Sequence, residues 1–149
     1  MARNSRRINV PPAQVFEVLL DPGSYAHWVV GSKVTRGVDE DWPAPGAAFY
    51  HASGAGPGEV KDQTKVLEIE ASRRLLLEAY FRPLGVMRVE LRLAPADGGT
   101  SVTMEENPAP GTALSRIGPL LSPIIHLRNK ESLRRLKQLA EQRWGKPSL

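Results

Sequence analysis

Within residues 86–94, hydrophobic and charged residues alternate from Met87 to Leu93, which is the pattern of a strand with one buried face. The apolar positions of this run are Met87, Val89, Leu91 and Leu93. Further runs with strand character cover residues 3–10, 33–41, 47–53, 59–70, 74–82 and 100–107. Turn signals such as Asp97-Gly98-Gly99 separate neighbouring runs, and tight turns of this kind join antiparallel strands. The pattern therefore predicts an antiparallel sheet of about seven strands.

Two short helical segments follow the first of these runs. Pro12 suits the first position of a helix, where the N–H that proline lacks would have no partner. Apolar residues at positions 15, 16 and 19 then share one helical face. Asp21-Pro22 ends this helix and can begin another turn, which carries Tyr25 and Trp28. The predicted order is thus a strand, two short helices and six successive strands.

Helical spacing dominates from residue 112 onward. The apolar residues that recur at this spacing are Leu114, Ile117, Leu121, Ile124, Ile125, Leu136 and Leu139. Pro119 and Pro123 leave two alternatives: one long kinked helix, or a new helix that Ser122 caps. A long helix must bury its apolar stripe, and the inner face of the sheet is the partner available. The predicted fold is α+β, with a curved sheet around a long C-terminal helix and a space for a ligand between them.

Charge is distributed unevenly along the 149 residues. Residues 1–7 carry a net charge of +3, residues 8–110 carry −5 and residues 111–149 carry +6, which gives +4 in total. An acidic body with basic ends differs from a uniformly basic nucleic-acid-binding module. We therefore expect no nucleic-acid partner.

Composition narrows the chemistry further. Cysteine is absent, which excludes disulfides, thiolate nucleophiles and cysteine-ligated zinc, and the three His residues are spread along the chain, so we predict no metal site. No apolar run approaches the ~20 residues that a membrane-spanning helix needs. No apolar stretch of signal-peptide type follows the N-terminal arginines. We expect a cytoplasmic protein without integral membrane association.

Five segments of the chain resemble the START-like (SRPBCC) superfamily, in its polyketide cyclase/dehydrase and lipid-transport branch. They are INVPPAQVFEVLLDPGSYAHWV, WPAPGAAFYHASGAGPGEVKDQTKVLE, RRLLLEAYFRPLGVMRVELRLAP, GGTSVTMEE and LLSPIIHLRNKESLRRLKQLA. The likeness extends over residues 3–142 and implies a helix-grip fold in a single domain, 1–149. It also implies binding of a hydrophobic, aromatic or polyketide-like small molecule without a cofactor. If the protein is an enzyme, the resemblance implies cyclisation or dehydration of the bound molecule.

His51 is the candidate catalytic residue. It shares strand parity with Phe49, so both side chains face the interior if either does. A histidine in a pocket can act as a general acid or base. The alternative is a structural histidine that is hydrogen-bonded within the sheet.

Arg128 and Glu106 are candidates for holding the polar end of a ligand. Arg128 falls within the apolar stripe of the long helix, and a buried arginine needs an anionic partner. Glu106 shares parity with Val102 and Met104 on the last strand, which places it on the inner face. The alternative is an internal ion pair between Arg128 and Glu106, and the proline break could also rotate Arg128 off this face.

The remaining candidates are apolar side chains expected to line the space between sheet and helix. They are Trp28, Phe49, Leu77, Met87, Val89, Met104, Ile117, Leu121 and Ile124. Strand parity leaves the direction of Asp62 open.

A competing hypothesis is a non-catalytic interaction protein. The basic C-terminal helix or the acidic segment 39–41 would then contact a partner. An exposed edge strand could also pair two copies in a homodimer.

Overall fold

The computed structural model describes residues 2–30, 32–53, 60–81 and 85–144, and within them seven strands form one antiparallel sheet. The strands are β1 (Ala2–Ile8), β2 (Ser32–Val38), β3 (Ala48–Ser53), β4 (Val60–Glu70), β5 (Arg74–Phe81), β6 (Gly85–Ala96) and β7 (Gly99–Pro108). Their order across the sheet is β1-β7-β6-β5-β4-β3-β2. The predicted antiparallel sheet is confirmed.

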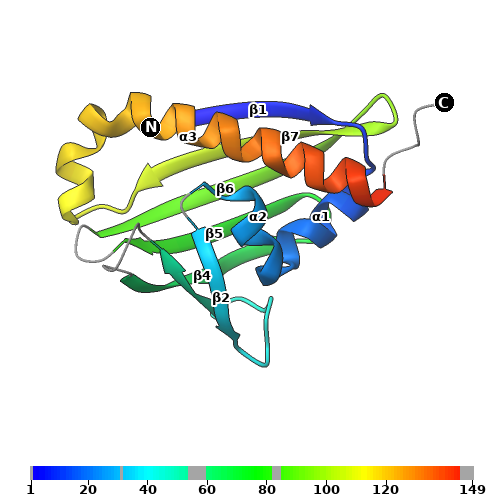
Figure 1. Ribbon diagram of the computed structural model, residues 1–149. Helices are drawn as coiled ribbons and strands as arrows, with labels where there is room; N and C mark the ends of the chain where they lie inside the picture. The colour runs from blue at the N-terminus through cyan, green and yellow to red at the C-terminus, as the bar shows by residue number, and fades with distance from the viewer. Residues whose placement is uncertain (1, 31, 54–59, 82–84, 145–149) are drawn as a thin grey trace.

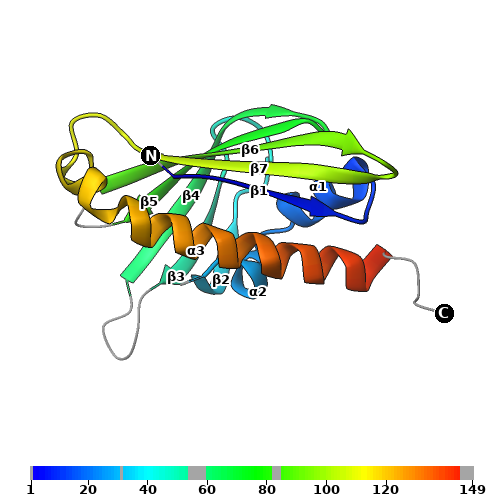
Figure 2. The same cartoon turned by 90° about the horizontal axis from the view of Figure 1, so that it is seen from above.

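Helices cover one face of this sheet (Figure 1). The helix α1 (Pro12–Leu20), the 3₁₀ turn η1 (Pro22–Ser24) and the helix α2 (Tyr25–Trp28) follow β1, and α3 (Ala113–Trp144) follows β7. Seen from above, α3 runs the length of the sheet beside β1, with α1 and α2 on the same side (Figure 2). The predicted α+β helix-grip arrangement is confirmed.

Some strand ends differ from the prediction. The strand predicted over 33–41 ends at Val38, because Asp39 turns the chain: its carboxylate accepts hydrogen bonds from the Ala48 N–H at 2.9 Å and the Tyr50 hydroxyl at 3.0 Å. The strand predicted over 3–10 ends at Ile8. The predicted strand ends at residues 59 and 82 lie outside the described residues.

Both prolines of the C-terminal segment lie inside α3, so the long kinked helix is the correct alternative. A proline in a helix removes one backbone hydrogen bond and its ring displaces the preceding turn. Figure 1 shows the first turns of α3 bending away from the line of the rest. The part of α3 that lies straight along the sheet is therefore its second half.

The buried face of α3 differs from the stripe that the sequence predicted. In the second half the buried residues are Asn129, Ser132, Leu133, Leu136 and Ala140. Ile117 is 37% exposed and Ile124 is 64% exposed, so the expectation that both are buried is wrong. At 100° per residue Ile117 lies about 120° and Ile124 about 140° around the helix from the centre of this buried face. In the first half of α3 the buried residues are Leu114 and Gly118, and Ile117 and Ile124 lie to one side of them.

Candidate functional site

The inner face of β3 carries two of the predicted residues, Phe49 and His51. Phe49 is 1% exposed, and its ring centroid lies 5.5 Å from that of His51. The Nε2 atom of the half-buried His51 lies 3.0 Å from the Thr64 hydroxyl of β4. The register places Asp62 directly opposite His51, and Asp62 is 5% exposed. The direction of Asp62, which parity left open, is therefore inward.

Phe49 is also part of an aromatic cluster with Tyr25 and Trp42. Its ring centroid lies 4.8 Å from that of Tyr25 and 5.1 Å from that of Trp42. The Tyr25 hydroxyl donates a hydrogen bond of 2.6 Å to the Leu19 carbonyl, and burial raises the pKa of this phenol. Trp28 is 1% exposed and donates its indole N–H to the Ser24 hydroxyl at 3.2 Å. These contacts place Phe49 and Trp28 in the hydrophobic core.

Glu106 and Arg128 meet in the interior. Glu106 is on β7, its side chain is 2% exposed, and its Oε1 lies 3.5 Å from an Nη1 of Arg128, whose side chain is 27% exposed. Arg128 also donates from Nε to the Val30 carbonyl at 2.9 Å. The internal ion pair that the sequence offered as an alternative is therefore present. It balances a carboxylate that would be costly to bury alone.

Asn129 is the interior residue that the sequence analysis missed. Its side chain is completely buried, and among the described residues neither its amide nitrogen nor its amide oxygen has a hydrogen-bond partner. Within the described residues Oε2 of Glu106 likewise has no hydrogen-bond partner. An apolar stripe anchored on Leu133, Leu136 and Ala140 would have included Asn129, because it lies one turn before Leu133.

Two further polar side chains fix α3 in place. The Ser132 hydroxyl accepts a hydrogen bond of 3.1 Å from the Val30 N–H, and Asn4 of β1 donates one of 3.2 Å to the His126 carbonyl. These bonds tie α3 to the segment after α2 and to the edge strand. Ser132, unlike Asn129, therefore has a structural partner.

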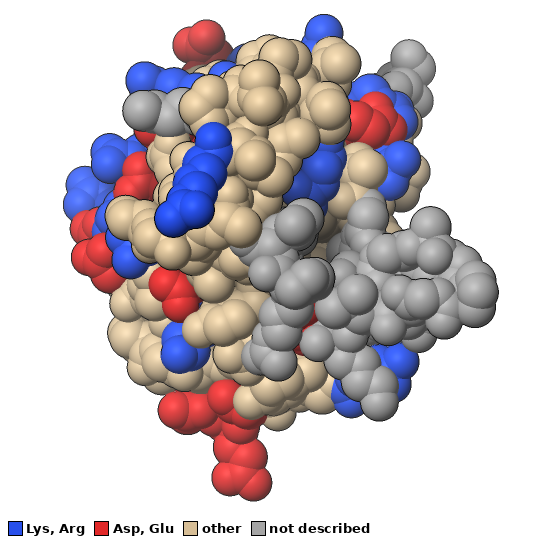
Figure 3. All heavy atoms as spheres, turned by 90° about the vertical axis from the view of Figure 1, so that its left-hand side faces the viewer, with Lys and Arg blue, Asp and Glu red and all other residues tan. Residues whose placement is uncertain are grey.

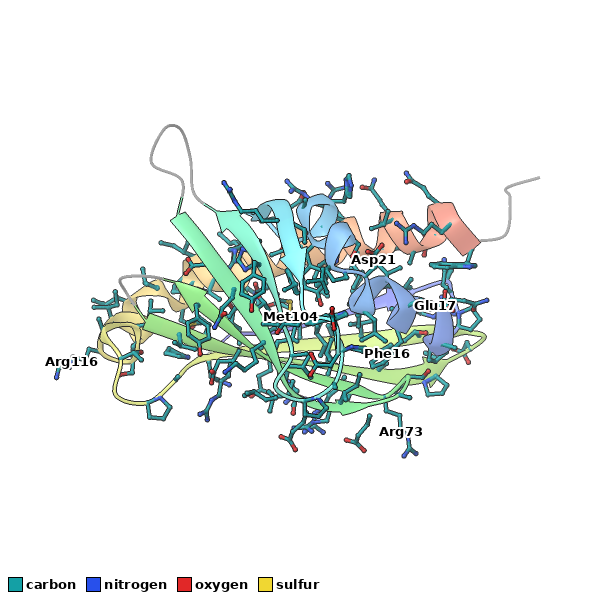
Figure 4. All side chains as sticks on the ribbon, turned by 90° about the horizontal axis from the view of Figure 1, so that it is seen from below. Phe16, Glu17, Asp21, Arg73, Met104 and Arg116 are labelled. Atoms are coloured by element: carbon teal, nitrogen blue, oxygen red, sulfur yellow. The ribbon has the colours of Figure 1, made fainter. Side chains whose placement is uncertain are left out.

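The predicted apolar residues of the sheet lie on its inner face. Leu77, Met87, Val89 and Met104 are each less than 9% exposed. In the register Glu106 pairs with Val89, and Val89 with Leu77, so the buried carboxylate has apolar neighbours across two strands. Figure 4 shows Met104 between the sheet and the helices. Leu121 of α3 is half-buried.

An open hollow of about 820 Å³ lies elsewhere in the molecule. Arg7, Asp97 and Glu141 are among the residues that line it, with Trp144 at the C-terminal end of α3. Its charged walls differ from the apolar inner face of the sheet. We therefore place the candidate site under α3, where buried polar groups stand among apolar side chains.

The candidate residues offer groups that can form hydrogen bonds and transfer protons. A carboxamide offers two donors and one acceptor, a carboxylate oxygen accepts, and an imidazole can accept or donate a proton. The inner face of the sheet carries buried aliphatic and thioether side chains, among them Met87, Val89 and Met104, which favour an apolar ligand body. Within the described residues no helix is long and apolar enough to cross a membrane.

Solved structures with the same fold come from several sources. CV1439 from Chromobacterium violaceum is 24% identical, with a TM-score of 0.70 and 97% of each chain covered. NE0264 from Nitrosomonas europaea is 22% identical, with a TM-score of 0.74 and coverage of 95% of this chain and 94% of that one. The di-domain ARO/CYC StfQ from the steffimycin biosynthetic pathway is 12% identical, with a TM-score of 0.70; the match covers 95% of this chain and 50% of StfQ.

At these identities the structures establish the fold alone. A search of curated proteins found no match. Residues 2–141 match the sequence profile of the family described as polyketide cyclase / dehydrase and lipid transport. That match spans nearly the whole chain, and it agrees with the resemblance that the five sequence segments carry. The chain therefore belongs to the polyketide cyclase/dehydrase and lipid-transport family.

Proposed function

We propose that this protein binds a hydrophobic small molecule between the sheet and α3, with a polar group of the ligand held by Asn129 and Glu106. The observation that carries the proposal is the buried Asn129 carboxamide, which has no hydrogen-bond partner among the described residues. Leaving a buried polar group unpaired costs about 1–3 kcal/mol, so such groups are rare in native interiors. A ligand with a hydrogen-bonding group would remove this cost.

The apolar body of the ligand would lie against Met87, Val89 and Met104. These side chains are buried on the inner face of β6 and β7, and the thioethers can adapt to an irregular ligand. Family membership supports an aromatic or polyketide-like ligand or a lipid. Burial of apolar ligand surface would provide the affinity, and the polar group would fix the orientation.

Binding is tested first by native mass spectrometry of the purified protein, followed by denaturing extraction. We expect a co-purifying hydrophobic small molecule and, after its removal, tight binding of the aromatic probe anilinonaphthalene sulfonate. A matched pair of variants locates the site. Val89→Trp places a tryptophan on the inner face of β6, whereas Arg88→Trp places one on the exposed outer face. Val89→Trp should weaken probe binding at least about tenfold, given that an apolar side chain contributes about 1.5–3 kcal/mol when buried.

Circular dichroism establishes whether both variants fold. If Val89→Trp does not fold, Met104→Ala replaces it as the test, because this substitution changes the same inner face by enlarging it. If the inner-face variant and Arg88→Trp both bind the probe as tightly as the unaltered protein, a site under α3 is contradicted. An empty protein that also shows no thermal shift with aromatic compounds and fatty acids would contradict ligand binding altogether.

Catalysis on the bound molecule is the second part of the proposal, and His51 is its acid–base residue. Its position beside Thr64 and opposite Asp62 on the inner face supports this role. StfQ, whose fold is similar, is an ARO/CYC protein of steffimycin biosynthesis. In a cyclisation, His51 would accept a proton from the attacking carbon and return one to the oxygen that becomes a hydroxyl.

A His51→Ala variant should bind an identified substrate with nearly unchanged affinity and convert it at roughly one hundredth of the original rate or less, the usual effect of losing a general base. Product formation measured by mass spectrometry under single-turnover conditions checks this. Undiminished conversion would leave His51 a structural residue.

A further inference from the structure

The outer side of the first half of α3 carries an apolar ridge. Among the described residues six large hydrophobic side chains are exposed, and four of them form this ridge: Ile117 at 37%, Leu120 at 81%, Ile124 at 64% and Leu127 at 66%. Their spacing of three and four residues puts them on one helical face. We call these four residues the α3 ridge. Figure 3 looks at this end of the molecule and shows a broad uncharged surface.

The ridge ends abruptly along the helix. The next residue on the same face is Glu131, whose carboxylate forms ion pairs with Arg134 at 2.6 Å and with Arg135 at 2.9 Å. The apolar surface is therefore confined to the kinked half of α3. It is not a misplaced extension of the core, because the core-facing residues of α3 lie on the opposite side.

Positive charge lies beside the ridge. A hollow of about 290 Å³ between β1 and α3 is lined by Arg3, Arg6, His126 and Lys130, and none of its described lining residues is acidic. We call it the basic hollow. Arg116 projects outward from the same end of the molecule (Figure 4). From Asn107 to Lys130 the sequence contains no acidic residue.

We propose that the α3 ridge and the basic hollow together dock on the surface of a bilayer that contains anionic phospholipids. A helix with aliphatic side chains on one face and cations beside them is the type that lies in a membrane interface. The aliphatic side chains would enter the headgroup region, and the basic hollow would take lipid phosphate groups. Each basic side chain near an anionic membrane surface contributes about 1 kcal/mol, or roughly a fivefold gain in binding.

The size of the ridge favours a bilayer over a second protein. Its four side chains expose on the order of 400 Å², whereas each partner in a standard protein interface buries about 800 Å². The cations also make a symmetrical pairing of two copies unfavourable, since it would bring the two basic hollows together. The proposal does not depend on ligand binding, because vesicles test it with the empty protein.

The test is co-sedimentation with phosphatidylcholine vesicles and with phosphatidylcholine–phosphatidylserine vesicles. We expect binding to the second kind that weakens with salt, and much weaker binding to the first. Leu120→Ser/Leu127→Ser should lower the affinity by roughly tenfold for each leucine. Arg3→Gln/Lys130→Gln should lower it by roughly fivefold for each charge and remove the preference for phosphatidylserine.

Two control variants remove the same chemistry from other surfaces. Val38→Ser deletes an exposed aliphatic side chain of β2, and Arg73→Gln deletes an exposed cation of the β4–β5 turn. Both should bind vesicles like the unaltered protein. Equal vesicle binding by the ridge variant and the Val38→Ser control would overturn the proposal. So would a change from dimer to monomer in the ridge variant without any vesicle binding, because the ridge would then be an interface between copies.

Discussion

An Arg128→Met variant is expected to lose about 3 kcal/mol of its free energy of unfolding, which is the lower end of the cost of removing one partner from a buried ion pair. Glu106 is almost completely buried, and Arg128, at 3.5 Å, is the cation that faces it. Without the guanidinium the carboxylate would remain in the interior with no balancing charge. The lower end applies because Arg128 itself is partly exposed. Urea unfolding followed by tryptophan fluorescence measures the loss.

The double variant Arg128→Met/Glu106→Gln provides the control for this interpretation. If the cost comes from an unbalanced Glu106, neutralising Glu106 should recover most of the lost stability. Arg134→Met, which removes an arginine from an exposed pair with Glu131, should change stability little. If Arg128→Met costs as much in the Glu106→Gln background as it does alone, Arg128 acts through its bond to the Val30 carbonyl instead.

The sheet could be predicted from the sequence because alternation and turn chemistry are local. The alternation within 86–94 corresponds to β6, whose odd-numbered side chains from Met87 to Leu93 are buried. Strand parity also placed Glu106 correctly on the inner face, and it linked the direction of His51 to that of Phe49, which is buried. A side chain two residues from a buried one in a strand has little freedom to face elsewhere.

The faces of α3 could not be predicted in the same way. All apolar residues at helical spacing were expected on the buried face, but the buried face of α3 is formed by Leu114 and Gly118 in the first half and by Asn129, Ser132, Leu133, Leu136 and Ala140 in the second. Ile117 and Ile124 are exposed because their positions on the helix point away from this buried face. Hydrophobic residues on a surface are common, so apolar character alone does not determine which side of a long helix is buried.

Asn129 was missed for the complementary reason. A polar residue is assigned to the surface by default, and only the position of Leu133 one turn later reveals the buried face. The two errors have one cause, since turning the stripe by roughly a quarter of a turn brings Asn129 to the sheet side and carries Ile124 away from it. The result is a helix with two distinct faces: an inner one with an amide that lacks a partner among the described residues, and an outer one with the α3 ridge.

An Asn129→Leu variant is expected to be more stable than the unaltered protein by about 1–2 kcal/mol when empty, and to bind its ligand more weakly. Leucine has the same branched outline as asparagine but no polar atoms, so the substitution removes a buried amide that finds no partner in the described part of the chain. This corresponds to a rise in melting temperature of roughly 2–8 °C for a chain of this size. The weaker binding follows because the polar group of the ligand would lose its partner, at a cost of about tenfold in affinity. Differential scanning calorimetry and titration with anilinonaphthalene sulfonate measure the two effects.

Ser132→Ala is the matched control, because Ser132 is as deeply buried on the same helix but accepts a hydrogen bond from the Val30 N–H. Loss of this hydrogen bond should lower the free energy of unfolding by about 1 kcal/mol and leave probe binding nearly unchanged. Opposite signs for the two substitutions would identify Asn129 as a residue kept at the expense of stability, as expected for a binding group. A destabilised Asn129→Leu protein with unaltered probe binding would instead make Asn129 structural, and the proposed ligand contact would be wrong.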